Sequence, residues 1–203
     1  VFAGAGTGVV QMVSGSSQGV PGVSGMTVRG EQRSYESSLI LLPTAQVWKD
    51  FPLVRTSYGR NFSAQEYETL FAAAGDFPQF PVRWPLVANL TSQLVFPGVN
   101  VTHMYGRGVD TPVAFAYEAK SDEDLPAAFR KGPADTIKSD GDGTVPLRSL
   151  MSIETAQGWA GHLSVRQFPG ETHTGLVKAK DYISAVVDIV TGRDERDQAM
   201  RTL

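Results

Sequence analysis

Apolar residues recur with helical spacing in two segments of the chain. In the first, residues 63–66 form a capping box that marks the start of a helix, and Gly75 marks its end. In the second, Gly192 is the stop signal of a helix near the end of the chain. The residues that share one face are Tyr67, Leu70, Phe71 and Ala74 in the first helix, and Ile183, Val186, Val187 and Val190 in the second.

Three other segments have the composition of strands. Residues 99–105 alternate and are rich in β-branched side chains, and residues 112–117 and 163–168 are predicted as two more strands. The apolar run 39–42 is expected to be a buried strand or core plug rather than a lid element that touches lipid.

Glycine, serine and proline dominate the remaining connections. Strands and helices follow one another around one sheet, which predicts an α/β fold. We expect one domain over residues 1–192 and a polar tail over 193–203. The predicted loops are 15–30, 77–97 and the acidic-then-basic stretch 121–134. The stretch 1–13 is small and glycine-rich, but the strand and helix that a dinucleotide-binding loop needs are not visible there.

Composition excludes several classes of protein. The 203 residues are 41% hydrophobic and 19% charged, which is typical of a globular domain. A net charge of -3 with scattered Lys and Arg argues against nucleic-acid binding. No apolar run approaches the roughly 18 residues of a membrane span. The chain has no cysteine, and His103, His162 and His173 form no paired zinc motif, so neither a cofactor nor a metal is expected.

The asparagines indicate a cellular route. The chain has three, Asn61, Asn89 and Asn100, and each begins an N-x-Ser/Thr triplet. We therefore expect glycosylation at these positions and passage through the secretory pathway. Chance occurrence in a cytosolic protein is the alternative.

An acidic loop and a late histidine carry the candidate chemistry. Asp142 lies between two glycines, which permit a sharp turn, and His173 follows the predicted strand 163–168. In α/β-hydrolases the triad occurs in the order Ser, Asp, His, and the carboxylate orients the histidine that accepts the serine proton. Asp142 and His173 are therefore the candidate acid and base, and the serine is expected upstream.

Other interpretations of these residues stay open at this point. Asp-Gly-Asp-Gly is also a good turn sequence, and a lone histidine is more often packed or exposed than catalytic. An EF-hand loop is excluded, because Val145 and Met151 occupy the positions that need Gly and Glu. His103 and His162 are expected to be packed or structural.

A literal G-x-S-x-G occurs at residues 15–19 and would make Ser17 a nucleophile. That role needs a strand before the serine and a helix after it, whereas Pro21 and further glycines follow here. Ser17 is therefore expected to lie in a flexible loop. A self-contained esterase that uses it is the least favoured hypothesis.

A series of short motifs spans residues 2–190: Ser14-Gly15, Gly19-Val20-Pro21, Glu31-Gln32-Arg33, Leu42-Pro43, Asn61-Phe62-Ser63, Tyr105-Gly106, Gly108, Thr111-Pro112, Asp140-Gly141-Asp142-Gly143-Thr144-Val145, Trp159, Pro169-Gly170 and His173. In this order they resemble the C-terminal half of the lecithin:cholesterol acyltransferase and lysosomal phospholipase A2 family. His103 stands where the family has a cysteine, and the partner cysteine near Trp159 is absent, so the resemblance implies loss of that disulfide.

The resemblance implies the C-terminal portion of an α/β-hydrolase with a lid or cap region. It implies cleavage of a glycerophospholipid acyl ester, with transfer to water or to an alcohol such as a sterol. Asp142, with Asp140 as its neighbour, matches the triad aspartate, and His173 matches the histidine. Residues 16–42 match the lid, and Asn61 matches a glycosylated position.

Two hypotheses follow. In the first, the chain belongs to a phospholipase/acyltransferase and works with an N-terminal segment or chain of the same precursor that carries the serine. Its substrate lies at a membrane or lipoprotein surface, and it resides outside the cell or in a lysosome-like compartment. In the second, the chain is an inactive α/β-hydrolase remnant that binds lipid or a protein partner.

Overall fold

The computed structural model describes residues 6–15, 22–91, 96–156, 158–159 and 161–193. Ser17 and most of the predicted tail lie outside the described residues. The helices are α1 (Gly6–Ser14), α2 (Gly25–Ser34), α3 (Glu36–Ile40), α4 (Ala45–Trp48), α5 (Tyr67–Ala74), α6 (Phe80–Thr91), α7 (Leu125–Lys131), α8 (Leu147–Leu150) and α9 (Lys180–Val190). The strands are β1 (Val54–Thr56), β2 (Asn61–Phe62), β3 (Val101–Arg107), β4 (Val109–Tyr117), β5 (Asp135–Gly141) and β6 (Leu163–Pro169).

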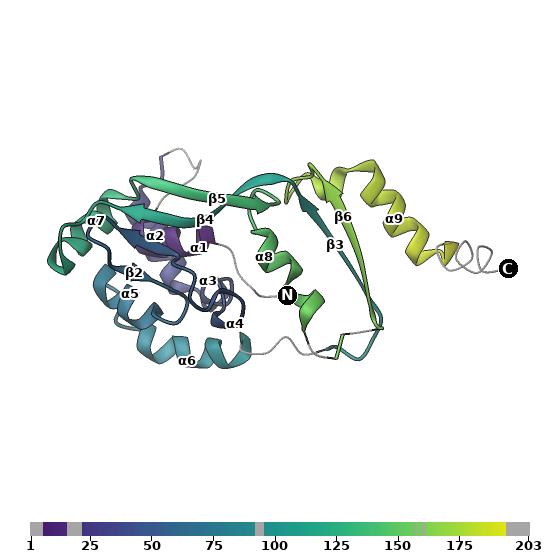
Figure 1. Cartoon of the computed structure of the whole chain (residues 1–203). Coiled ribbons are helices and arrows are strands. Elements are labelled where there is room, and N and C mark those ends of the chain that lie inside the picture. The colour runs from purple at the N-terminus through teal and green to yellow at the C-terminus, as the bar shows by residue number, and fades with distance from the viewer. Residues whose placement is uncertain (1–5, 16–21, 92–95, 157, 160, 194–203) are drawn as a thin grey trace.

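The strands form two sheets that meet at one bend. A four-stranded sheet has the order β2-β1-β4-β5, and β3 and β6 form a parallel pair. Strands β3 and β4 are consecutive and are separated by Gly108, whose φ is 82°. A positive φ is accessible to glycine without a steric penalty, so the chain can bend there. The two sheets diverge from this bend in Figure 1. The expected α/β class is confirmed.

Strand register brings the ends of β5 and β6 to the same bend. β5 runs antiparallel to β4, and its last residue, Gly141, pairs with Val109. β6 runs parallel to β3, and its last residue, Pro169, pairs with Arg107. The loops that follow β5 and β6 therefore emerge next to each other, on either side of Gly108.

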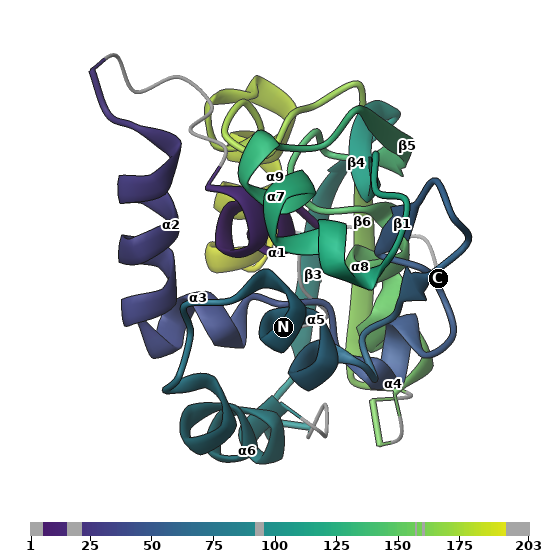
Figure 2. The same cartoon turned by 90° about the vertical axis from the view of Figure 1, so that its left-hand side faces the viewer.

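The core lies beside the four-stranded sheet. Helix α1 packs on β4 and contacts α2, α5 and α7, so it occupies the centre of the helical layer (Figure 2). No helix is visible in the sequence of residues 1–13, so α1 corrects that interpretation. Valine and glycine are poor helix formers, but burial of an apolar face outweighs that preference. The buried side chains of α1 include Val9, Val10, Met12 and Val13.

Helix α2 replaces part of the loop predicted over 15–30. Ser24 caps it by accepting a hydrogen bond from the Thr27 amide at 3.1 Å. Arg29 donates to the Ala74 and Gly75 carbonyls, and Arg33 donates to Gly75 at 2.6 Å. These two buried arginines tie α2 to the end of α5. Whether residues 16–42 act as a lid stays a prediction.

Three more connections are helical. The run 39–42 forms the end of α3 and the turn after it, and Leu39 and Leu42 are buried, so it contributes to the core but is not a strand. Helix α6 crosses the region predicted as irregular and contains Pro85. Helix α7 occupies the predicted loop 121–134 and buries Leu125 and Phe129. In α6 and α7 the burial of apolar side chains outweighs the local proline or polar signal.

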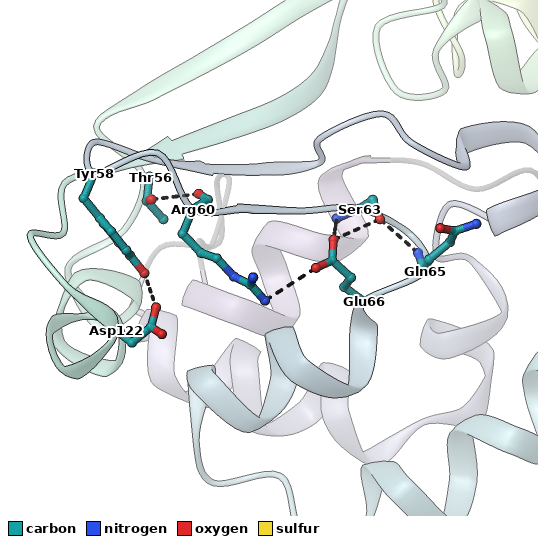
Figure 3. Close-up of polar contacts among 7 residues, drawn as sticks. All are labelled: Thr56, Tyr58, Arg60, Ser63, Gln65, Glu66 and Asp122. Carbon is teal, nitrogen blue, oxygen red and sulfur yellow. Dashed lines mark hydrogen bonds and ion pairs between the residues drawn. The ribbon is translucent and has the colours of Figure 1, made fainter.

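The predicted capping box is half formed (Figure 3). Glu66 accepts a hydrogen bond from the Ser63 amide at 3.0 Å, as expected. In a complete capping box the Ser63 hydroxyl would accept a hydrogen bond from the Glu66 backbone amide. Here it accepts one from the Gln65 amide at 3.3 Å, and the helix begins at Tyr67. The predicted apolar face is buried, and Gly75, with φ of 68°, ends the helix. In the same view, the Tyr58 hydroxyl donates to Asp122.

Candidate active site

Asp142 lies at the start of the loop that follows β5. The residue is only 4% exposed. Its Oδ1 accepts hydrogen bonds from the amides of Thr144 at 2.9 Å and Val145 at 2.7 Å. Gly143, with φ of 85°, makes this turn possible. The loop thus holds one carboxylate oxygen through its own backbone and leaves the other available.

His173 hydrogen-bonds to the second carboxylate oxygen of Asp142. Its Nδ1 lies 2.8 Å from Asp142 Oδ2, and its backbone amide donates to the Asp142 carbonyl at 2.7 Å. Because an ionised carboxylate only accepts hydrogen bonds, Nδ1 is the donor in this contact. The His173 side chain is half-exposed, and no hydrogen bond to its Nε2 occurs among the described residues.

This geometry suits a general base. A carboxylate on Nδ1 fixes the ring orientation, directs the basic lone pair to Nε2 and stabilises the imidazolium. The residues predicted from sequence as acid and base are therefore adjacent, although 31 positions separate them. No serine hydroxyl forms a hydrogen bond with His173 within the described part of the chain.

Thr111, on β4, supports the loop that carries Asp142. This fully buried residue accepts a hydrogen bond from the Gly143 amide at 2.8 Å and donates to the Val109 carbonyl at 2.8 Å. The amides of residues 143, 144 and 145 are thus all paired, one with Thr111 and two with Asp142. Thr111-Pro112 is one of the motifs on which the family resemblance rests, but nothing near it in the sequence indicates the Gly143 amide as its partner.

The other two histidines lie elsewhere. His103 Nε2 is 2.8 Å from the Leu150 carbonyl, and burial lowers the pKa of His103 below its usual value. His162 Nδ1 is 3.0 Å from Asn100 Oδ1 on the surface. Neither residue hydrogen-bonds to Asp142.

The three glycosylation candidates are exposed. Asn61 lies on β2, Asn89 on α6 and Asn100 just before β3. None of the helices among the described residues is long and apolar enough to cross a membrane.

Comparison with known proteins identifies relatives, although no family model matches. Lecithin-cholesterol acyltransferase-like 1 of Arabidopsis thaliana is 40% identical over 169 residues, covering 81% of this chain and 35% of that protein. The lysosomal phospholipase A and acyltransferase of Canis lupus familiaris is 30% identical over 82% of the chain and 38% of its own length. The phosphatidylcholine-sterol acyltransferase of Rattus norvegicus is 30% identical over 87% of the chain and 39% of its own length.

The chain thus spans between 35% and 39% of the length of these relatives. The similarity covers between 81% and 87% of this chain. It confirms the resemblance drawn from the motifs. The chain therefore belongs to the family of lecithin-cholesterol acyltransferases and lysosomal phospholipase A/acyltransferases.

Proposed function

We propose that this chain supplies the acid and the base of a serine phospholipase A/acyltransferase. The observation that carries the proposal is the 2.8 Å contact between His173 Nδ1 and the buried Asp142 carboxylate. It occurs in a chain whose relatives are named for phospholipase A and acyltransferase activity. The acyl acceptor is water or an alcohol of the sterol type.

The proposed chemistry proceeds in two transfers. A serine oxygen attacks the acyl carbonyl of a glycerophospholipid while His173 Nε2 takes the serine proton. The imidazolium returns this proton to the leaving lysophospholipid oxygen, which leaves an acyl-enzyme. Water or an alcohol then attacks the acyl group while Nε2 takes its proton, and the imidazolium returns this proton to the serine oxygen as the acyl–serine bond breaks. Asp142 stays ionised and holds the ring throughout.

The serine belongs, in this proposal, to an N-terminal segment or chain of the same precursor. Two surfaces support such a partner. Parallel strands are normally covered on both faces, whereas β3 and β6 form an isolated pair among the described residues. Helix α9 also presents an apolar stripe to solvent, in which Ile183 is 48%, Val187 41% and Val190 74% exposed. A docked segment would cover both features.

The test compares the 203-residue chain with a precursor that includes upstream sequence. Phosphatidylcholine vesicles, with and without a sterol, report acyl release and acyl transfer. Fluorophosphonate labelling followed by peptide mass spectrometry identifies the nucleophile. We expect label on an upstream serine only, and we expect His173→Ala and Asp142→Asn to lower turnover by about 10⁴-fold.

Matched controls are His162→Gln and Asp135→Asn, which change a surface histidine and the aspartate at the opposite end of β5. Both should retain turnover. Label on Ser17 in the 203-residue chain would replace the proposal with a self-contained esterase. Lipid binding without turnover in the precursor would favour the inactive remnant.

We also propose that Asn61, Asn89 and Asn100 carry N-linked glycans and that the protein is secreted or resides in a lysosome-like compartment. The exposure of all three side chains supports this. Peptide mass spectrometry after enzymatic deglycosylation would detect conversion of each modified Asn to Asp. Unmodified asparagines in protein from its native source would contradict the proposal.

A further inference from the structure

The two site residues belong to different sheets. Asp142 follows β5 of the four-stranded sheet, whereas His173 follows β6 of the parallel pair. Apart from the backbone hydrogen bond from the His173 amide to the Asp142 carbonyl, their separation depends on how firmly the two sheets are held at the Gly108 bend. Backbone hydrogen bonds inside each sheet cannot fix that relationship.

Arg107 bridges the strands that lead to the two site residues. Its Nη2 donates to Asp140 Oδ2 on β5 at 3.2 Å, and its Nη1 donates to Gln167 Oε1 on β6 at 2.8 Å. Asp140 lies two residues before Asp142. One guanidinium thus spans from one sheet to the other beside the site.

Asp140 adds a backbone contact at the bend itself. Its Oδ1 accepts a hydrogen bond from the Gly108 amide at 2.6 Å. A carboxylate that accepts from both an amide and a guanidinium makes charge-assisted hydrogen bonds, which are stronger than neutral ones. Asp140 therefore joins β5 to the residue at which β3 becomes β4.

The other end of the bridge is also anchored. The Gln167 side-chain amide donates to the Tyr105 hydroxyl at 2.7 Å, and that hydroxyl donates to Glu154 at 2.6 Å. Burial, together with Glu154, raises the pKa of Tyr105 to about 12, so its hydroxyl remains a donor. The polar chain from Asp140 to Glu154 has a partner at every step.

We infer that Asp140 and Arg107 are positioning residues that hold Asp142 and His173 at hydrogen-bonding distance by joining the two sheets. The two aspartates of the Asp-Gly-Asp-Gly loop thus have separate roles. Asp142 orients the ring, and Asp140 holds the strand from which Asp142 projects. The inference rests on the proposed function only for its effect on turnover, because the geometry can be measured without catalysis.

The tautomer of His173 in the 203-residue chain reports the geometry directly. Two-bond correlations between the ring carbon-bound protons and ¹⁵N distinguish the Nδ1–H from the Nε2–H form. We expect the wild-type chain to hold the Nδ1–H form, and Asp142→Asn, as a positive control, to lose it. Arg107→Gln and Asp140→Ala are expected to shift the population toward Nε2–H.

Asp140→Asn separates the two contacts of Asp140. An asparagine can still accept from the Gly108 amide but lacks the charge that attracts Arg107. An intermediate shift is expected. Lys138→Gln and Asp135→Asn are matched controls, because both are exposed residues on β5 away from the bend. If Asp140→Ala unfolds the chain, Asp140→Asn and Arg107→Gln decide the question.

Turnover gives a second readout in the precursor that carries the serine. Misplacing a catalytic group by about 1 Å costs on the order of 100-fold, so Arg107→Gln and Asp140→Ala should lower kcat by about 10- to 100-fold with KM nearly unchanged. An unchanged tautomer in folded Arg107→Gln and Asp140→Asn overturns the inference. A wild-type precursor without turnover would instead contradict the proposed function and leave the tautomer test intact.

Discussion

Gly106 lies directly against the backbone carbonyl of Glu171, two residues before His173. A side-chain methyl group at position 106 would overlap that oxygen. Gly170 is fixed on the same side, because its amide donates to the Arg107 carbonyl at 2.7 Å. The loop that presents the histidine therefore rests on a position where only glycine fits.

Gly106→Ala should displace this loop and separate His173 from Asp142. We expect a loss of about 2 kcal/mol in the free energy of unfolding from the steric overlap, together with loss of the Nδ1–H tautomer of His173. Urea denaturation and the ¹⁵N correlations measure these two effects. Gly30→Ala, in open space on α2, is the control and should be neutral or stabilising. Retention of the tautomer in Gly106→Ala would show that the loop can move without disturbing the pair.

Thr111→Val should weaken the acid loop. The substitution keeps the shape of the side chain but leaves the Gly143 amide without its acceptor. An unpaired buried donor costs about 1–3 kcal/mol. Thr111→Ser keeps the hydroxyl and should remain within about 1 kcal/mol of the wild type. Equal denaturation midpoints for the valine and serine variants would show that the Thr111 hydroxyl does not support the loop.

Arg33→Lys should destabilise the helical layer although it preserves charge. Arg33 donates from Nε to the Met12 carbonyl at 2.8 Å and from Nη1 to Gly75 at 2.6 Å, and burial lowers its pKa to about 10. One lysine ammonium cannot reproduce this fork. We expect a loss of about 2–4 kcal/mol in unfolding free energy. The control is Arg60→Lys, at a half-exposed position. A similar small loss of unfolding free energy at both positions would contradict the stabilising role of the Arg33 hydrogen bonds.

His103 should make stability depend on pH. Burial lowers its folded-state pKa below the usual 6.5, with the Leu150 carbonyl and Glu154 acting in the opposite direction. The unfolded chain therefore binds a proton more readily, so this contribution is complete above about pH 6.5 and is lost as pH falls below that value. Urea denaturation between pH 7.5 and about 5 measures the slope.

His103→Gln should remove this component of the slope, whereas the surface substitution His162→Gln should retain it. Equal slopes in wild type and His103→Gln would contradict the prediction. The comparison should be made at one salt concentration, because ionic strength screens the neighbouring charges.

Much of the site could be predicted because its signals are local or ordered along the chain. Glycines on both sides of Asp142 specify a turn, and the order of acid loop, strand and histidine restricts the chemistry. By contrast, the supporting contacts join positions that only folding brings together. Thr111 meets the Gly143 amide 32 residues away, and Asp140 meets Gly108 at the same separation. No periodicity in the sequence encodes such partners.

The fold was predictable where one apolar face repeats, as in α5 and α9. It was not predictable where tertiary burial overrides composition. Helix α1 is rich in valine and glycine, and α6 contains Pro85, yet both bury apolar side chains that stabilise them in place. Arginine is usually exposed, but the donors of Arg29 and Arg33 satisfy carbonyls at the end of α5, which no local pattern indicates.

The bend at Gly108 makes the spacing of the site independent of the connecting segments. Asp142 is located by the pairing of β5 with β4, and His173 by the pairing of β6 with β3. Insertions or deletions in the exposed turns between β4 and α7, or immediately before β6, can change chain length without altering either register. A one-residue slip of β6 along β3 has the opposite effect, because it turns every side chain of that strand to the other face. The exposed loops of this chain can therefore differ in length, whereas the alignment of its strands cannot shift without moving the Asp142–His173 pair apart.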